Sequence, residues 1–458
     1  MADNKKSDIT ALAQKPIGRL LWEYSAPAVI GMLVMSIYNI IDRVYIGRGV
    51  GVEAISGLAI TFPVMNLSAA LGVLIGAGAA ARTSILLGAG DKKGAERVLG
   101  NSLVLTVLIG IAYITCFAVF LDPILYAFGA SDVTIGPARE FMQWILPGML
   151  VINICFSFNN IMRASGYPIR AMFTMIIGAV LNIAIGPIFI FALGLGIKGA
   201  AIATDISMLV SASFVMWHFF QKKSEVHFTR GIYSLKGRVV WNIVNIGLAP
   251  SLVNAASCLI NIFVNRSLKD YGSDIDVGAV SIFITYTSLL TSIVVGIGMG
   301  MQPIVGYNFG AGRPDRLKKA YYLAALIGTA LCTAGSIFGL AFPELIAYAF
   351  TDDPGLTAVI VNGFEHALLL FWVVGFQIIS TSFFQSIGKW GQSIVLSLSR
   401  QVLFMLPLLF ILPKWLGING VWLSFPVSDG LATIVTAALV IWQIHSINRA
   451  VKAQSQTI

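Results

Sequence analysis

The sequence predicts an all-α integral membrane protein, with twelve transmembrane helices in two parallel-repeat six-helix lobes around a central cleft. Its composition is apolar: 57% of the 458 residues are hydrophobic and 11% are charged, whereas about a quarter are charged in soluble domains. Apolar stretches of roughly 20 to 28 residues recur along the chain, and each is long enough to cross about 30 Å of hydrocarbon as a helix. The third observation is an internal repeat, which divides these stretches into two sets of six.

We predict helical spans because a membrane β-barrel would show alternation at period two over about ten residues. Several spans contain Gly or Pro, which membrane helices tolerate when neighbouring helices satisfy the freed backbone groups. The first 19 residues are polar and mildly basic, so we expect no removable signal peptide. The predicted spans are 20–46, 54–80, 98–121, 138–162, 169–193, 198–220, 240–265, 277–305, 319–343, 358–384, 391–413 and 418–444.

The basic residues are distributed unequally between the two sides of the membrane. If alternate loops are assigned to one side, 22 of the 30 Lys and Arg residues fall on that side. The other side receives only Arg48, Arg139, Lys198, Arg266, Lys269 and Lys414. Since cytoplasmic loops carry the excess of basic residues, both termini are expected to be cytoplasmic. The net charge of +9 therefore reports topology, and we expect no nucleic-acid partner.

The residues that usually build metal or enzyme sites are scattered. Cys116, Cys155, Cys258 and Cys332 fall inside apolar spans without paired spacing, as buried apolar cysteines do. The four histidines show no metal-ligand spacing. The glycine-rich stretch "LGAGDKKGAERVL" at 87–99 has neither a preceding strand nor the Lys-Ser/Thr pair of a phosphate loop. We expect no enzyme, no metal site and no cofactor.

The repeat has an offset of 222 residues. It pairs "LGAGDKKGAERVL" at 87–99 with "FGAGRPDRLKKAY" at 309–321, and "RASG" at 163–166 with "QSIG" at 385–388. One residue of slippage later, "LGIKG" at 195–199 pairs with "LGING" at 416–420. Six spans separate each position from its partner, so the halves enter the membrane in the same orientation, as in transporters whose site lies between two parallel repeats.

This pattern predicts five segments. They are a cytoplasmic N-terminal segment (1–19), an N-lobe (20–220), a cytoplasmic linker loop (221–238), a C-lobe (239–446) and a cytoplasmic tail (447–458). The offset also pairs Gly76 and Gly78 with Gly298 and Gly300. We interpret these four glycines as points of close helix approach rather than ligand contacts.

Acidic residues inside spans indicate where function lies, because each costs about 2.5 to 3.5 kcal/mol at a helix centre. Asp42, Asp205, Glu365 and Asp429 meet this criterion. Asp42 shares one helical face with Met35, Tyr38 and Asn39, and that face is expected to look into the protein. The alternatives for Asp42 are a satisfied ion pair or an interfacial position. For Glu365 and Asp429 we expect a structural role near span ends. The offset pairs Asp42 with Val264, so any titrating site is expected in the N-lobe.

Four stretches together resemble the multidrug and toxic compound extrusion (MATE) transporters. They are "SAPAVIGMLVMSIYNIIDRVYIG" at 25–47, "GAVLNIAIGPIFIF" at 178–191, "LGIKGAAIAT" at 195–204 and "GVWLSFPVSD" at 420–429. The stretches "FFQSIGK" at 383–389 and "SRQVLFMLPLLFILPK" at 399–414 are similar to the MepA-like bacterial branch. The resemblance covers nearly all of residues 15–445.

The resemblance implies an antiporter in the cytoplasmic (inner) membrane of a bacterium, which exports amphipathic, often cationic, drugs or toxins in exchange for H⁺ or Na⁺. It implies that Asp42 couples the ion, that Pro27 bends the first helix, and that Asn182 and Thr204 belong to the coupling site. Many members carry an aspartate where this chain has Gly186. Asp205 is a substitute for it or, equally, a separate interhelical contact.

A site with one carboxylate fewer favours H⁺ over Na⁺, because hard cations prefer several oxygen ligands, whereas burial of a lone carboxylate favours its protonated form. The candidate substrate contacts are Met35, Tyr38, Asn39, Asn153 and Asn159, since flexible Met-rich surfaces adapt to varied ligands. We expect a functional monomer whose partners are small molecules and the bilayer. The alternatives are a lipid-linked oligosaccharide or lipid flippase and, third, a membrane scaffold or sensor.

Overall fold

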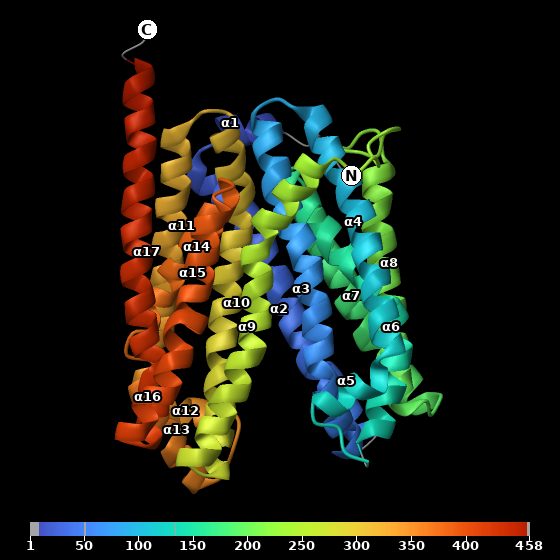
Figure 1. The fold of residues 1–458 in the computed structure, drawn as a ribbon, viewed down its shortest axis with the longest axis vertical. Helices are drawn as coiled ribbons and strands as arrows, with labels where there is room; N and C mark the ends of the chain where they lie inside the picture. The colour runs from blue at the N-terminus through green and yellow to red at the C-terminus, as the bar shows by residue number, and fades with distance from the viewer. Residues whose placement is uncertain (1–8, 50–51, 133, 456–458) are drawn as a thin grey trace.

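The structure, a computed structural model, describes residues 9–49, 52–132 and 134–455. Within these ranges the chain forms a helical bundle of two lobes (Figure 1). Eleven of the described helices are long and apolar enough to cross a membrane, and a bent pair supplies a twelfth span. The predicted all-α membrane fold is confirmed. The structure does not describe residues 1–8 and 456–458, which belong to the predicted terminal segments. It also does not describe the side chains of Arg48 and Cys258.

The N-lobe contains the first six spans and the C-lobe the last six. The N-lobe helices are α2 (Ile17–Gly49), α3 (Val52–Gly88), α4 (Lys92–Val119), α6 (Ile135–Ala164), α7 (Pro168–Pro187) and α8 (Gly196–Phe220), with the short α1 (Ile9–Gln14) and α5 (Leu121–Ala127). The C-lobe helices are α9 (Gly237–Tyr271), α10 (Asp274–Gly310), α11 (Pro314–Ala341), α13 (Pro354–Ala367), α14 (Val374–Ser386), α15 (Trp390–Leu398), α16 (Leu406–Leu416) and α17 (Ile418–Ser455), with the short α12 (Pro343–Tyr348).

Three spans depart from straight α-helix. The span predicted at 358–384 consists of α13 and α14, which are bent by 59° around a short 3₁₀ turn, Phe371–Val373. The fifth span ends in a π-helical turn, Ile188–Ala192, and the eleventh contains another, Ser399–Met405, between α15 and α16. Such π turns inside α-helices frequently occur at functional sites.

The lobes meet through α2 and α3 of one lobe and α9 and α10 of the other. They converge at the end that carries α1 and the tip of α17, and diverge toward the end that carries α5 and α13 (Figure 1). The repeated glycines explain the close contact. A Cβ on Gly78 would clash with the Ile243 carbonyl of α9, and one on Gly300 would lie 2.5 Å from the Ser25 backbone nitrogen of α2.

The other two repeated glycines pack within their own lobes. Gly76 lies against Ser157 of α6, and Gly298 lies against Ser382 of α14. Therefore one glycine of each Gly-x-Gly pair packs against a helix from its own half of the sequence, while the other packs against a helix from the other half. This arrangement supports the interpretation of these glycines as points of close helix approach.

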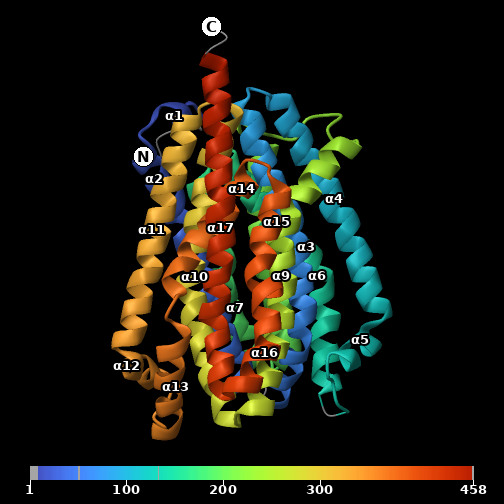
Figure 2. The same ribbon diagram turned by 60° about the vertical axis from the view of Figure 1, so that its left-hand side comes forward.

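The beginning of the chain packs with the C-lobe, although the helix it leads into belongs to the N-lobe (Figure 2). Leu12, Leu20 and Tyr24 are 1%, 0% and 6% exposed and belong to the C-lobe core. Arg316 Nη2 donates to the Leu12 carbonyl at 3.1 Å and to the Lys15 carbonyl at 2.7 Å. Farther along α2, Ile46 is part of an N-lobe core. The first span thus passes from one lobe's core to the other's, and Pro27 lies between the two parts.

The loop predicted as the linker folds back onto the N-lobe. The Asn101 side-chain amide of α4 donates to the carbonyls of Ile232 and Ser234, at 3.0 and 3.1 Å, and its oxygen accepts from the Lys236 backbone N–H at 2.9 Å. Val226 is fully buried. Because the loop is anchored in this way, the chain passes to α9 from a fixed position on the N-lobe.

Candidate functional site

A buried polar pair joins α7 and α8 inside the N-lobe. Asn182 Nδ2 of α7 donates a 3.0 Å hydrogen bond to Thr204 Oγ1 of α8, which in turn donates to the Ala200 carbonyl at 3.0 Å. Asn182 is 1% exposed and Thr204 8%. Because an unmade hydrogen bond is costly in such surroundings, the pair fixes the two helices relative to each other. Two of the predicted coupling residues are therefore in direct contact.

The first helix adds Tyr38 and Asp42 to this pair. The Tyr38 hydroxyl lies within hydrogen-bonding reach of Thr204, and the carboxylates of Asp42 and Asp205 are near enough to act on Tyr38 electrostatically. Tyr38 is 6% exposed, Asp42 is half-buried and Asn39 is exposed. The face predicted from Met35, Tyr38, Asn39 and Asp42 is thus divided, with Tyr38 pointing into the N-lobe and Asn39 outside the polar cluster.

Asp205 points in another direction from its neighbour Thr204. Its carboxylate packs against Gly148 of α6, where an added Cβ would clash with Oδ1. This oxygen is buried and has no hydrogen-bond partner among the described residues. Asp205 is therefore a second acid of the N-lobe, near Tyr38 but apart from the Asn182–Thr204 hydrogen bond.

Gly186 lies one helical turn after Asn182 on the same face of α7. A Cβ built there would stand 3.6 Å from Tyr45 Cδ2 and 3.7 Å from Asn182 Oδ1, which are ordinary contact distances. A side chain would begin in unoccupied space next to the Asn182–Thr204 pair. The absence of a carboxylate at this position therefore does not result from a lack of room for its Cβ.

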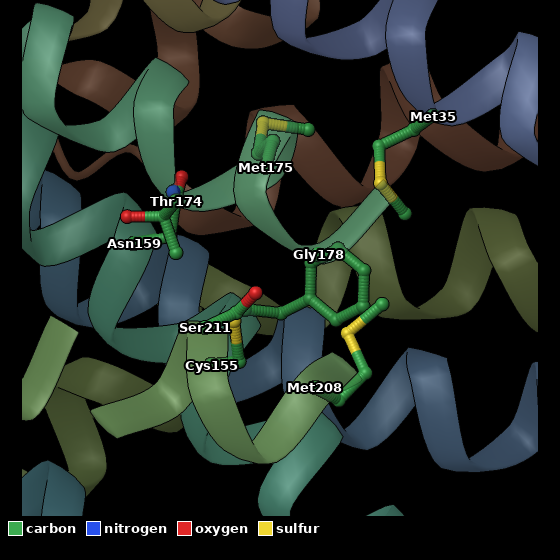
Figure 3. Close-up of a pocket in the computed structure, with 9 residues that line it drawn as sticks. Met35, Cys155, Asn159, Thr174, Met175, Gly178, Met208 and Ser211 are labelled. Atoms are coloured by element: carbon green, nitrogen blue, oxygen red, sulfur yellow. The ribbon is translucent and has the colours of Figure 1, made fainter. Parts of the chain in front are cut away.

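A small pocket lies between α2, α6, α7 and α8 (Figure 3). Its free volume is about 10 Å³, which is room for a single water molecule at most. Three methionines, Met35, Met175 and Met208, surround it from three helices. Met side chains change rotamer easily, so these three are the most adaptable part of the lining. It is lined by Met35, Cys155, Phe156, Asn159, Thr174, Met175, Gly178, Met208 and Ser211.

Two of the five predicted substrate contacts, Met35 and Asn159, line this pocket. Asn159 also holds α7 and the buried Arg163, because its Nδ2 donates to the Ala171 carbonyl at 2.6 Å and its Oδ1 accepts from Arg163 Nη2 at 2.9 Å. Asn153 lies elsewhere: it is 3% exposed between α6 and α3, and its Nδ2 donates to Ser68 Oγ at 3.1 Å. The structure thus places Asn153 in a helix contact rather than in the pocket.

The C-lobe contains a charged pair that corrects one sequence expectation. Asp429 was expected near a span's end. Instead, Asp429 is 2% exposed, eleven residues inside α17, and accepts a 2.6 Å hydrogen bond from Arg400 Nε. The error has a physical reason, since a buried acid needs a partner and the partner lies 29 residues away in another helix. Glu365, by contrast, is exposed near the end of α13.

Comparison with known proteins agrees with this architecture. The MatE family model matches residues 27–188 and 247–411. The FAD transporter of Shewanella oneidensis is 26% identical over 436 residues, which are 93% of this chain and 95% of that protein. The multidrug export protein MepA of Staphylococcus aureus is 25% identical over 440 residues, 95% of this chain and 96% of MepA. The outward-facing structure of a multidrug resistance MATE family transporter of the MOP superfamily has a TM-score of 0.91 at 26% identity, covering 98% of this chain and all of that one.

Proposed function

The chain belongs to the MatE family of multidrug efflux transporters, which are not enzymes, and from this premise we propose that it is a secondary active antiporter. It exports amphipathic, often cationic, small molecules in exchange for H⁺ by alternating access. The observation that carries this proposal is the cluster of Tyr38, Asp42, Asn182 and Thr204, which links an acid of the first helix to a buried hydrogen bond between α7 and α8.

The proposed location is the cytoplasmic membrane of a bacterium, with both termini in the cytoplasm, and the proposed working unit is the monomer. The excess of basic residues on the side of the termini supports this orientation. The lobes then pack together at the cytoplasmic end, where Gly78 of α3 contacts Ile243 of α9. In this conformation the transporter faces outward.

Asp42 carries the proton in this mechanism. A single proton is worth roughly 2.3 kcal/mol per 100 mV and about 1.4 kcal/mol per pH unit, which supports a drug gradient on the order of tenfold to a thousandfold. Na⁺ is the less favoured ion because hard cations need several oxygen ligands. Gly186 supplies no side-chain oxygen, and Asp205 is directed toward Gly148.

Substrate binding is assigned to the methionine-lined pocket, which would admit a substrate once Met35, Met175 and Met208 change rotamer. These three side chains and Phe156 offer an apolar, deformable surface suited to amphipathic molecules of different shapes. Protonation of Asp42 would alter its interaction with Tyr38, which shares α2 with Met35. Loading of the proton and release of the drug are thereby coupled through one helix.

A flippase for lipid-linked oligosaccharides is the weaker alternative. It would need a strongly cationic cavity for a pyrophosphate group. Arg163 is buried and bonded to Asn159 and Asn160, and Arg400 is paired with Asp429. The side chain of Arg43 lies outside the described part of the structure. A scaffold or sensor is disfavoured by membership of a transporter family.

Ethidium efflux tests the proposal. Purified protein is reconstituted into liposomes, and pH and Na⁺ gradients are imposed separately. The proposal expects ethidium transport to follow the pH gradient in the absence of Na⁺. Transport that follows only the Na⁺ gradient would overturn the assignment of H⁺, and no transport of ethidium or other amphipathic cations under either gradient would overturn the proposed antiport.

A further inference from the structure

The repeat relates the C-lobe ion pair to the N-lobe pocket. The offset of 222 residues pairs Arg400 with Gly178, and the offset of 221 that applies from Leu195 onward pairs Asp429 with Met208. Gly178 and Met208 both line the methionine pocket, and a Cβ on Gly178 would lie 3.6 Å from Met208 Cε. The same two positions therefore line an apolar pocket in the N-lobe and form an Arg–Asp ion pair in the C-lobe.

The protein satisfies only some of the hydrogen-bond donors of the Arg400 guanidinium. Its Nε donates to Asp429 Oδ1, whereas Nη1 and Nη2 have no hydrogen-bond partner among the described residues. The Arg400 side chain is 30% exposed. A guanidinium presents two parallel N–H donors to a carboxylate. The terminal edge of Arg400 is thus accessible and available for an anionic group.

Arg400 lies on the side of its span that faces the other C-lobe helices. Val402 and Leu403, which follow it in the π turn, are 41% and 58% exposed and mark the outer side of this span. Leu396 and Met405, on the inner side, are 5% and 4% exposed. Arg400 and Asp429 also act electrostatically on Cys332 of α11, which is fully buried. The guanidinium therefore lies among α11, α17 and the π turn.

A polar neighbour in the same π turn has an unused acceptor. Gln401 Nε2 donates to Ser257 Oγ of α9 at 3.0 Å, while its Oε1 is buried with no partner among the residues described. On the other side, Gln377 Nε2 donates to the Asp429 carbonyl at 2.7 Å and holds the backbone that carries the acid. The ion pair is therefore built into a polar framework from α9, α14 and α17.

We propose that Arg400 is an oxyanion-recognition site of the C-lobe, which binds the carboxylate group of an amphipathic substrate through Nη1 and Nη2. Asp429 orients the guanidinium and balances its charge when the site is empty, because an unpaired buried charge is strongly destabilising. With Asp429 beside it, the site suits a singly charged carboxylate better than a doubly charged phosphate. The proposal rests on the antiporter function above, and it extends the substrates from cations to zwitterions.

A matched pair of dyes tests this. Tetramethylrhodamine is a zwitterion with a free carboxylate, and its methyl ester is the corresponding cation. Binding of each to the purified protein in detergent is measured by fluorescence polarisation. We expect the wild type to prefer the acid over the ester. Arg400→Gln should reduce this preference by about tenfold, the equivalent of roughly 1.4 kcal/mol and the lower end of a charge-assisted hydrogen bond.

Two further variants guard against misfolding. Arg400→Gln combined with Asp429→Asn leaves no unpaired charge and should show the same lost preference, whereas Asp429→Asn alone keeps the guanidinium and should increase it. The control is Arg266→Gln, which breaks an exposed Arg–Asp pair on α9 and should leave the preference unchanged. Equal affinity of the wild type for acid and ester, or a preference that survives in the double variant, would overturn the proposal. Binding requires no ion gradient, so a failure of ethidium transport would be a separate result.

Discussion

Asn182 and Thr204 form the buried hydrogen bond around which the N-lobe cluster is built, with 3.0 Å between Nδ2 and Oγ1. Tyr38 reaches the same hydroxyl from α2, and Asp42 follows Tyr38 by one turn. A change in the charge of Asp42 is therefore felt at a point where three helices meet.

Asp42→Asn should abolish proton-coupled efflux while the protein still folds and inserts. The amide keeps the shape of the side chain but cannot exchange a proton. Proton-driven ethidium transport in liposomes is the measurement, with monodispersity in detergent as the test of folding. Asp122→Asn is the control, because Asp122 pairs with Arg139 on the protein surface between the third and fourth spans. Wild-type transport by the Asp42 variant would contradict the coupling role.

Thr204→Val should lower the thermal midpoint of the purified protein and slow efflux. The substitution keeps the side-chain shape but leaves the Asn182 amide buried without its acceptor, at a cost of about 1 to 3 kcal/mol. Thr204→Ser retains the hydroxyl and should restore most of both properties. For comparison, Thr285→Val removes an exposed hydroxyl that bonds only within its own helix, and little change is expected. An unchanged midpoint in Thr204→Val would mean that the bond adds no stability.

The sequence predicted the spans well because the bilayer requires long apolar helices, which are visible locally. It also predicted that the repeated glycines lie where helices approach closely, because such a contact leaves no room for a larger side chain. It could not predict that Leu12, Leu20 and Tyr24 pack in the C-lobe core. Apolar periodicity shows that a face is buried but does not show which helix covers it.

Long-range polar partners were the other limit. Arg400 and Asp429 were each visible inside an apolar span, but nothing local indicated that they contact each other across 29 residues. Asn153 is a related case. The sequence shows an amide inside a span, and in the structure this amide bonds to Ser68 in a neighbouring helix. Asparagines that join helices and asparagines that bind ligands look alike in a single sequence.

Gly186→Asp should be tolerated and should make transport responsive to Na⁺. The new Cβ meets Tyr45 and Asn182 at ordinary contact distances, and the carboxylate would add oxygen ligands beside Asn182, as hard cations require. Ethidium transport driven by a Na⁺ gradient at equal pH is the measurement. Gly178→Asp is the comparison variant. Its Cβ would stand only 2.7 Å from Ser211 Oγ, so this substitution should disturb packing. A well-folded Gly186→Asp variant without any response to Na⁺ would argue against a coupling site at this position.

Gly78→Leu should separate the lobes at the end that carries α1, because any side chain there meets the Ile243 carbonyl. Spin labels at Lys93 of the N-lobe and Asp315 of the C-lobe report this separation, in a background without Cys116, Cys155, Cys258 and Cys332. Pulsed electron paramagnetic resonance should show a longer label distance than in the background protein. Gly136→Leu is the control, since no atom lies within 4 Å of its added Cβ. Equal distances in the two variants would show that Gly78 does not set the lobe contact.

The N-terminal segment should move with the C-lobe when the lobes separate. Arg313 and Arg316 bond to carbonyls of residues 12, 13 and 15, and Pro27 lacks the backbone N–H that would tie the next part of α2 to the turn before it. A third label at Gln14, which is exposed on α1, tests this in the Gly78→Leu variant. The distance from Gln14 to Lys93 should lengthen, while that from Gln14 to Asp315 stays constant. If the Gln14–Asp315 distance lengthens instead, α1 travels with the N-lobe, and its bonds to Arg313 and Arg316 must break in each cycle.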